Sequence, residues 1–179
     1  MPELVPPTVD ARESFLVAMD EYVADGRGGF DDFSNIGNDL RAYASTWSTP
    51  AGFARFVGYL RAQRLEETPR PVGFVPTTVL WWLDGPEYLG RLNIRHRLAP
   101  GLAGERNGHI GYDVRPGARR KGHATAMLAA CKPIAAALGL SQVLVTCDFD
   151  NEASRRTIER NGGVPTRRLD EKLRFWVPV

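Results

Sequence analysis

The order of the elements that the sequence predicts places this chain in the mixed α/β class, as a single domain. Amphipathic helices are expected before residue 70, whereas the chain from residue 77 onward alternates strands with helices. A length of 179 residues, with 43% hydrophobic and 25% charged residues, is ordinary for one globular domain. We therefore expect one domain over residues 1–179, with a helical part at 1–70 and a sheet-containing part at 77–179.

The helical part begins with a short strand at Leu4–Thr8, which three prolines weaken. A first helix is expected next, because the following apolar residues have the spacing of one helical face, and it ends at Gly26–Gly29. A loop and one short helix are expected over Phe30–Tyr43. A second amphipathic helix begins at Thr49–Pro50, where a capping threonine precedes a proline in the first turn.

Strands follow a connector that is rich in proline. Thr77–Leu83 and Tyr88–Leu98 are β-branched and aromatic, and the turn residues Asp84–Glu87 between them predict a hairpin. Pro100–Gly108 is expected to be a loop. His109–Val114 is expected to be the next strand.

The C-terminal part alternates helices and strands. A long helix is expected after Gly122, a strand at Val143–Thr146 and a short helix at Asn151–Arg160. Final strands are expected at Thr166–Arg168 and Leu173–Val177. This order completes one mixed sheet.

A basic loop precedes the long helix. Its charged residues are Arg119, Arg120 and Lys121. A helix N-terminus presents free N–H groups and a positive dipole end, so this loop is expected to bind phosphate. The alternative is a charge run that is merely solvated. Gly117–Gly122 matches the beginning of a P-loop, but His123 and Ala124 replace the Lys and the Ser/Thr that follow, which argues against a nucleotide hydrolase.

The arrangement Arg119-x-x-Gly122-x-Ala124 after a strand resembles the acyl-CoA loop of the GNAT acetyltransferase family. The strand Val143–Thr146, the segment Asn151–Ser154 and the segment Ile158–Gly162 are similar to the second cofactor segment of that family. The resemblance covers about residues 88–163 and rests on two motifs in a matching strand–helix context.

The resemblance implies a central, mostly antiparallel twisted sheet of about six to seven strands flanked by helices, with a CoA cleft where two parallel strands splay apart. It implies acetyl-CoA as cosubstrate and no metal. The residues that it implies for cofactor binding are the strand edge at Tyr112 and Val114, the loop and first helical turn at Arg119, Arg120, Lys121, Gly122, His123, Ala124 and Thr125, and the helix start at Asn151 and Ser154.

Catalytic residues are less defined by the sequence. His109 stands where the family often has a glutamate, so it is either the base that deprotonates an amine or a histidine packed in the sheet. Ile158 stands where the family often has a tyrosine acid. Another donor, with Tyr88, Tyr112 and Cys147 as candidates, or solvent would then protonate the departing thiolate.

The function expected is acetyl transfer from acetyl-CoA directly to a primary amine of a small molecule or a protein. The alternative is a non-catalytic acyl-CoA-binding or regulatory module of the same fold, which Ile158 favours. The acceptor is expected between the N-terminal helices and the hairpin, near a loop that is either an amine site or simply a solvated acidic loop. Its residues are Asp31, Asp32, Phe33, Asn38 and Asp39.

Composition limits the other partners. A net charge of +2 and the lack of aromatic residues within the basic loop argue against nucleic acid. No apolar run has the ~18 residues of a membrane span, and the first residues lack the apolar core of a signal peptide. The two cysteines form no CxxC pair and the histidines no HExxH motif. We expect a cytoplasmic monomer or homodimer without a membrane partner.

Overall fold

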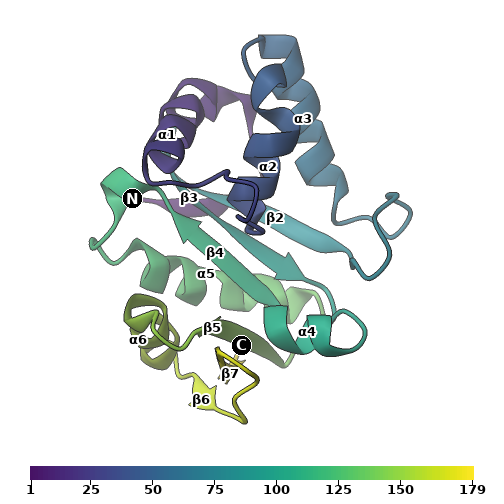
Figure 1. Cartoon of the computed structure of the whole chain (residues 1–179). Coiled ribbons are helices and arrows are strands. Elements are labelled where there is room, and N and C mark those ends of the chain that lie inside the picture. Colours follow the sequence, from purple (N-terminus) through teal and green to yellow (C-terminus); the bar gives the residue numbers. More distant parts are fainter.

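A seven-stranded sheet runs through the molecule and carries helices on both faces (Figure 1). The computed structural model describes residues 1–179. The strands lie in the order β1-β2-β3-β4-β5-β7-β6. They are β1 (Glu3–Val5), β2 (Thr77–Asp84), β3 (Glu87–Arg95), β4 (Ile110–Val114), β5 (Gln142–Asp148), β6 (Val164–Pro165) and β7 (Lys172–Pro178). The helices are α1 (Arg12–Ala24), α2 (Asn35–Tyr43), α3 (Pro50–Ala62), α4 (Leu102–Asn107), α5 (His123–Ala137) and α6 (Glu152–Arg160).

The pairing of the strands is antiparallel at every position except one. β2 and β3 form the predicted hairpin. β4 and β5 run parallel, and the crossover that parallel strands require is supplied by α5. The predicted mixed sheet of six to seven mostly antiparallel strands is confirmed.

The ends of some strands differ from the expectation, since the strand expected at Leu4–Thr8 is Glu3–Val5 and the strand expected to reach Leu98 ends at Arg95. Two other segments differ in kind. Pro100–Gly108 was expected to be a loop but contains α4, which lies between Gly101 and Gly108, both with positive φ. A helix of 6 residues is too short to give a periodic apolar pattern. Thr166–Arg168 is not a strand, because the edge of the sheet is formed by the two residues Val164–Pro165 of β6 instead.

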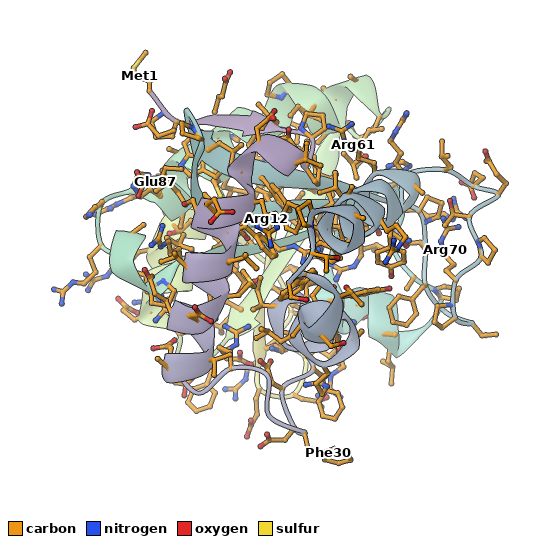
Figure 2. The ribbon with its side chains drawn as sticks, turned by 90° about the horizontal axis from the view of Figure 1, so that it is seen from above. Met1, Arg12, Phe30, Arg61, Arg70 and Glu87 are labelled. Carbon is orange, nitrogen blue, oxygen red and sulfur yellow. The ribbon has the colours of Figure 1, made fainter.

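Alternation of side chains along β2 divides the core into two layers. Trp81 packs with α1, α2 and α3 on one face, whereas Trp82 packs with α5 on the other. In the first layer, the Phe15 ring of α1 stacks on Trp81 at 5.1 Å and meets Tyr88 edge-on at 5.2 Å. Figure 2 looks down on this layer. The N-terminal helices therefore share their core with the sheet.

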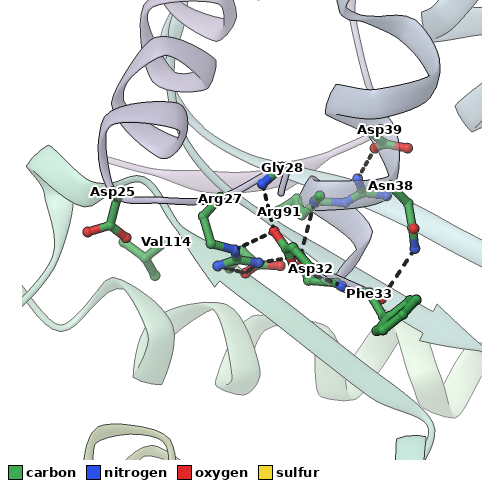
Figure 3. Close-up of polar contacts among 12 residues, drawn as sticks. Asp25, Arg27, Gly28, Asp32, Phe33, Asn38, Asp39, Arg91 and Val114 are labelled. Carbon is green, nitrogen blue, oxygen red and sulfur yellow. Dashed lines mark hydrogen bonds and ion pairs between the residues drawn. The ribbon is translucent and has the colours of Figure 1, made fainter. Parts of the chain in front are cut away.

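One ion pair is buried between α2 and the sheet (Figure 3). Arg91 of β3 pairs with Asp39 of α2, and their side chains are only 6% and 14% exposed. The Nε group of Arg91 also donates to Asn93 Oδ1 at 3.3 Å. A buried guanidinium is costly without a carboxylate partner, so this pair fixes α2 on β3.

Asp32 organises the segment between α1 and α2 (Figure 3). Its carboxylate accepts hydrogen bonds from the N–H groups of Gly28 at 2.9 Å and Ser34 at 3.0 Å, and pairs with Arg27 at 3.0 Å. Burial alone raises the pKa of Asp32, but the hydrogen bonds from Ser34, Gly28 and Arg27 outweigh it and hold the pKa well below its usual value. Arg27 also reaches Asp113 of β4 at 3.3 Å, so the segment is fastened to the sheet.

Cys131 and Cys147 are both buried and unpaired, as small apolar residues would be. No helix combines the length and the apolar character needed to cross a bilayer.

The buried pair predicts a large stability effect. Replacing Asp39 by Asn should lower the free energy of unfolding by about 3–5 kcal/mol, because it leaves Arg91 charged and buried without a carboxylate. Urea unfolding measures this. The exposed pair of Arg97 with Glu66, whose side chains are 55% and 65% exposed, provides the control. Glu66→Gln should cost far less, because solvent screens an exposed ion pair. Equal losses in the two variants would contradict the role given to the buried pair.

Asp32 predicts a pH dependence. A carboxylate whose pKa is lower in the folded than in the unfolded state adds stability at pH values above its unfolded pKa, and this stability is lost as the pH falls toward the folded pKa. Asp32→Ala should therefore cost about 1–3 kcal/mol above pH 5 and progressively less below pH 4. Unfolding free energies of both proteins between pH 3 and 7 measure the difference. A difference that does not vary with pH would rule out the stabilising role of the Asp32 carboxylate.

Candidate functional site

The site lies where β4 and β5 separate. Their only registered pair joins Ile110, the first residue of β4, to Val145 of β5, and the strands diverge beyond it. A groove of 860 Å³ opens there between β4, the loop after it, the first turn of α5 and one side of α6. All the residues that sequence analysis proposed for cofactor binding line this groove except Lys121. Lys121 lines a neighbouring cavity of 230 Å³.

The edge of β4 directs backbone groups at the groove. The N–H of Arg115 donates to the carbonyl of Leu89 in β3 at 2.9 Å. Since alternate residues of a strand direct their backbone groups to the same side, those of Tyr112 and Val114 point away from β3 and toward the groove. The Val114 carbonyl accepts a hydrogen bond from Arg119 Nε at 3.3 Å. An extended chain in the groove can therefore pair with β4 as an additional strand does.

The N–H groups from Arg120 to Thr125 are free to bind a ligand of negative charge. None of them donates to a backbone carbonyl, as expected for the residues that open a helix. Gly122 caps α5 with φ +85°, and Arg120 has φ +63°. Left-handed residues of this kind turn successive N–H groups toward one point, and the dipole of α5 adds to their attraction for an anion. A side chain at Gly122 would meet no atom of the chain, so its positive φ is what requires glycine.

α1 holds this loop in position through two carboxylates. Glu21 accepts hydrogen bonds from Arg115 Nη2 at 2.6 Å and from the N–H of Gly117 at 2.8 Å. The hydrogen bond from Arg115 is the main reason why the pKa of Glu21 lies below its usual value. Asp25, one turn later, pairs with Arg119 at 2.7 Å. The Arg119 side chain is therefore directed at α1, and its guanidinium stabilises the loop.

Sequence reasoning did not identify Glu21 or Asp25. The partner of Glu21 lies 94 positions away, and no local pattern signals such a contact. Two carboxylates at i and i+4 on one helix are common on solvated faces, so their spacing alone did not indicate a role in the site.

α6 forms the other wall. Asn151 caps it by accepting a hydrogen bond from the N–H of Ser154 at 3.0 Å. The Ser154 hydroxyl lies 2.7 Å from the hydroxyl of Tyr112, so the two walls meet at this point. Burial raises the pKa of Tyr112 to about 12, which keeps its hydroxyl protonated at neutral pH. Two groove residues on α6 were missed by the sequence analysis, namely Arg156 and Arg160.

His123 connects the groove to the core. Its Nδ1 accepts a hydrogen bond from the indole N–H of Trp82 at 3.2 Å. In the neutral ring this places the proton on Nε2. His123 therefore supports the first turn of α5 from β2, and it lines both the groove and the smaller cavity.

The two residues expected to be catalytic lie outside the groove lining. His109 is 6% exposed, and its Nδ1 accepts a hydrogen bond from the N–H of Leu144 at 2.9 Å. Its own N–H donates to the Leu144 carbonyl at 2.7 Å, and burial lowers its pKa. This geometry favours a structural role that fastens β4 to β5, and the role of base stays a prediction. Tyr88 is fully buried in the aromatic layer, and its hydroxyl has no partner.

The acidic residues expected to attract an amine are largely paired within the chain. Asp32 pairs with Arg27, and Asp39 pairs with Arg91. What the segment between α1 and α2 exposes instead is aromatic, because Phe33 is 81% exposed and Phe30, at the tip in Figure 2, is 94% exposed.

A family model described as "Acetyltransferase (GNAT) domain" matches residues 33–164, which is more than half of the chain. No curated protein matches the chain by sequence.

Solved structures of acetyltransferases share the fold. PaiA N-acetyltransferase from Thermoplasma acidophilum, in complex with coenzyme A, superposes with a TM-score of 0.60 at 11% identity and covers 100% of this chain and 99% of that one. The self-immunity acetyltransferase MccE, in complex with acetyl-CoA and AMP, gives 0.59 at 12% identity over 98% and 91%. RimL, a ribosomal alpha-N-protein acetyltransferase in complex with coenzyme A, gives 0.59 at 15% identity over 98% and 92%.

The matched residues run from just before α2 to the first residue of β6, and they include the loop, α5 and α6 that form the groove. The same overall fold recurs in these acetyltransferases. The chain belongs to the GNAT acetyltransferase family.

Proposed function

We propose that this protein transfers an acetyl group from acetyl-CoA directly to a primary amine of a small molecule or of a protein. Membership of the family supports acetyl transfer. The similar structures bound to acetyl-CoA or coenzyme A support the choice of cosubstrate.

The observation that carries the proposal is the series of N–H groups from Arg120 to Thr125 at the start of α5. A pyrophosphate is recognised by several N–H donors that converge at a helix N-terminus. The edge of β4 at Tyr112 and Val114 continues from this surface toward the point where β4 meets β5. The groove thus has an anion site at one end and a strand edge for an amide-containing arm along its side.

The reaction needs a neutral amine whose lone pair attacks the thioester carbonyl. A C–N bond forms, the C–S bond breaks, and the CoA sulfur leaves as a thiolate that takes a proton. We assign the role of proton donor to the hydroxyl of Tyr112. Tyr112 lines the groove, its hydroxyl remains protonated at neutral pH, and it contacts Ser154. Deprotonation of the amine by His109 stays a prediction, because His109 lies outside the groove lining.

Direct transfer is preferred to an acyl-enzyme because neither cysteine suits a nucleophile. Cys147 is 5% exposed and Cys131 is fully buried. Burial raises the pKa of both thiols, and the thiolate is the nucleophilic form.

A second candidate function is a non-catalytic acyl-CoA-binding module. Ile158, where a tyrosine acid is frequent in the family, is fully buried in the core and cannot donate a proton. The two candidates are separated by incubating the protein with acetyl-CoA and a panel of amines and measuring free thiol. Release of thiol that depends on an amine supports transfer, whereas binding of acetyl-CoA without such release across the panel supports the module.

A steric block tests the groove. Ala124 lines the groove in the first turn of α5, so Ala124→Trp should lower the affinity for acetyl-CoA by at least about 100-fold. Ala126, on the same helix, is exposed and does not line the groove, so Ala126→Trp is the matched control and should leave the affinity unchanged. Calorimetric titration measures both. Unchanged binding by the Ala124 variant would remove the groove as the cofactor site.

Loss of the hydroxyl tests the proton donor. Tyr112→Phe should lower kcat by about 10- to 100-fold, because solvent then has to protonate the thiolate, while the dissociation constant for acetyl-CoA changes little. Because the pKa of Tyr112 is about 12, the wild-type rate should not fall through its ionisation up to about pH 10. Steady-state kinetics and titration measure the two constants. A variant with full kcat would transfer the role to another donor.

A further inference from the structure

We infer that Arg156 and Arg160 of α6 bind the 3′-phosphate of the CoA adenosine and make the protein select CoA over 3′-dephospho-CoA. This inference rests on the proposed function, since it assigns one part of the ligand to one part of the same groove. The two arginines are four residues apart on the helix, so they lie on one face, and both line the groove.

The position of these arginines along the groove follows from the contacts at the two ends of α6. Ser154, near the start of the helix, touches Tyr112 of β4 at 2.7 Å. Asn161, directly after its end, donates through Nδ2 to the carbonyl of Thr125 at 3.2 Å. Thr125 belongs to the first turn of α5, where the anion-binding N–H groups lie. The groove side of α6 therefore runs from the strand edge to the phosphate end, and Arg160 lies at the phosphate end.

The charge on this helix is distributed unevenly. Arg155 pairs with Glu152 at 2.6 Å and with Glu159 at 3.8 Å. Arg156 shares the same Glu152 carboxylate at 2.7 Å. Neither glutamate lines the groove. Glu152 and Glu159 together balance Arg155 and Arg156, so the third arginine of α6, which lines the groove, leaves the helix with an excess of positive charge.

Arg160 carries this excess positive charge. It makes no ion pair and no side-chain hydrogen bond within the chain. Its guanidinium offers five N–H donors in a planar fork, which matches a phosphate. Arg156 retains the terminal nitrogens of its guanidinium, because only its Nε is bonded to Glu152.

The sequence of chemical groups along CoA matches the sequence of groups along the groove. The amide-bearing arm corresponds to the edge of β4, and the pyrophosphate corresponds to the N–H groups of the loop. The remaining charged group of CoA is the 3′-phosphate, which is a separate dianion. The remaining cations on the groove side of α6 are Arg156 and Arg160. Backbone N–H groups already serve the pyrophosphate, so these side chains are available for a second phosphate.

The test compares CoA with 3′-dephospho-CoA by calorimetric titration of the full chain. The wild-type protein should bind CoA about 10- to 100-fold more tightly, the range expected for charge-assisted hydrogen bonds at a partly exposed site. The Arg156→Gln, Arg160→Gln double variant should lose most of this preference. Its affinity for 3′-dephospho-CoA should stay within about threefold of the wild-type value.

Arg155→Gln is the matched control. Arg155 belongs to the same helix and carries the same charge, but it does not line the groove, so this variant should keep the preference for CoA. Arg160→Gln alone breaks no ion pair and no side-chain hydrogen bond of the folded chain. It should reduce the preference by an intermediate factor, which guards against a double variant that does not fold.

The outcomes distinguish the inference from the proposed function. Equal wild-type affinity for the two ligands, or an equal loss for both in the double variant, would overturn the assignment of the arginines while leaving the groove as the cofactor site. Failure of the wild-type protein to bind either ligand would overturn the proposed function itself. An Arg155 variant that loses the preference as fully as the double variant would show a general charge effect and reject the specific contact.

Discussion

The separation of β4 from β5 is the feature on which the site depends. The two strands share one registered pair, Ile110 with Val145, and no other part of the sheet contains parallel neighbours. His109 strengthens the closed end, because both its backbone and its ring bond to Leu144. Beyond that point the edge of β4 has no strand beside it. An unpaired strand edge inside a domain can pair with an extended ligand, and the loop before α5 places free N–H groups at the end of the same edge.

The N-terminal helices also hold the groove in position, in addition to any part they have in binding the acceptor. Glu21 and Asp25 of α1 hold the loop through Arg115, Gly117 and Arg119. Arg27, just after α1, reaches Asp113 of β4. α1 is itself fixed by the aromatic layer around Phe15. The stability of the first layer therefore bears on the geometry of the groove in the second, and changes far from the ligand can alter its binding.

The fold and most of the groove lining could be predicted from the sequence, because their signals are local. The hairpin is marked by β-branched and aromatic runs around a turn, and the loop before α5 by Gly122 ahead of an apolar-periodic helix. Contacts between distant residues gave no such signal. The pairing of Glu21 with Arg115, the engagement of Asp39 by Arg91, and the packing of His109 on Leu144 depend on the tertiary fold. Arg156 and Arg160 were missed because only the position of α6 shows which of its arginines face the groove.

Amide hydrogen exchange with and without acetyl-CoA tests whether the free edge of β4 binds the cofactor, because it reports on this edge residue by residue. The N–H groups of Tyr112 and Val114, which face the groove, should become protected when acetyl-CoA is added. The N–H groups of Gly111 and Asp113, which face β3, should be protected already and change little. Saturating acetyl-CoA that leaves Tyr112 and Val114 exchanging as before, or that protects β4 no more than the strands remote from the groove, would contradict binding at this edge.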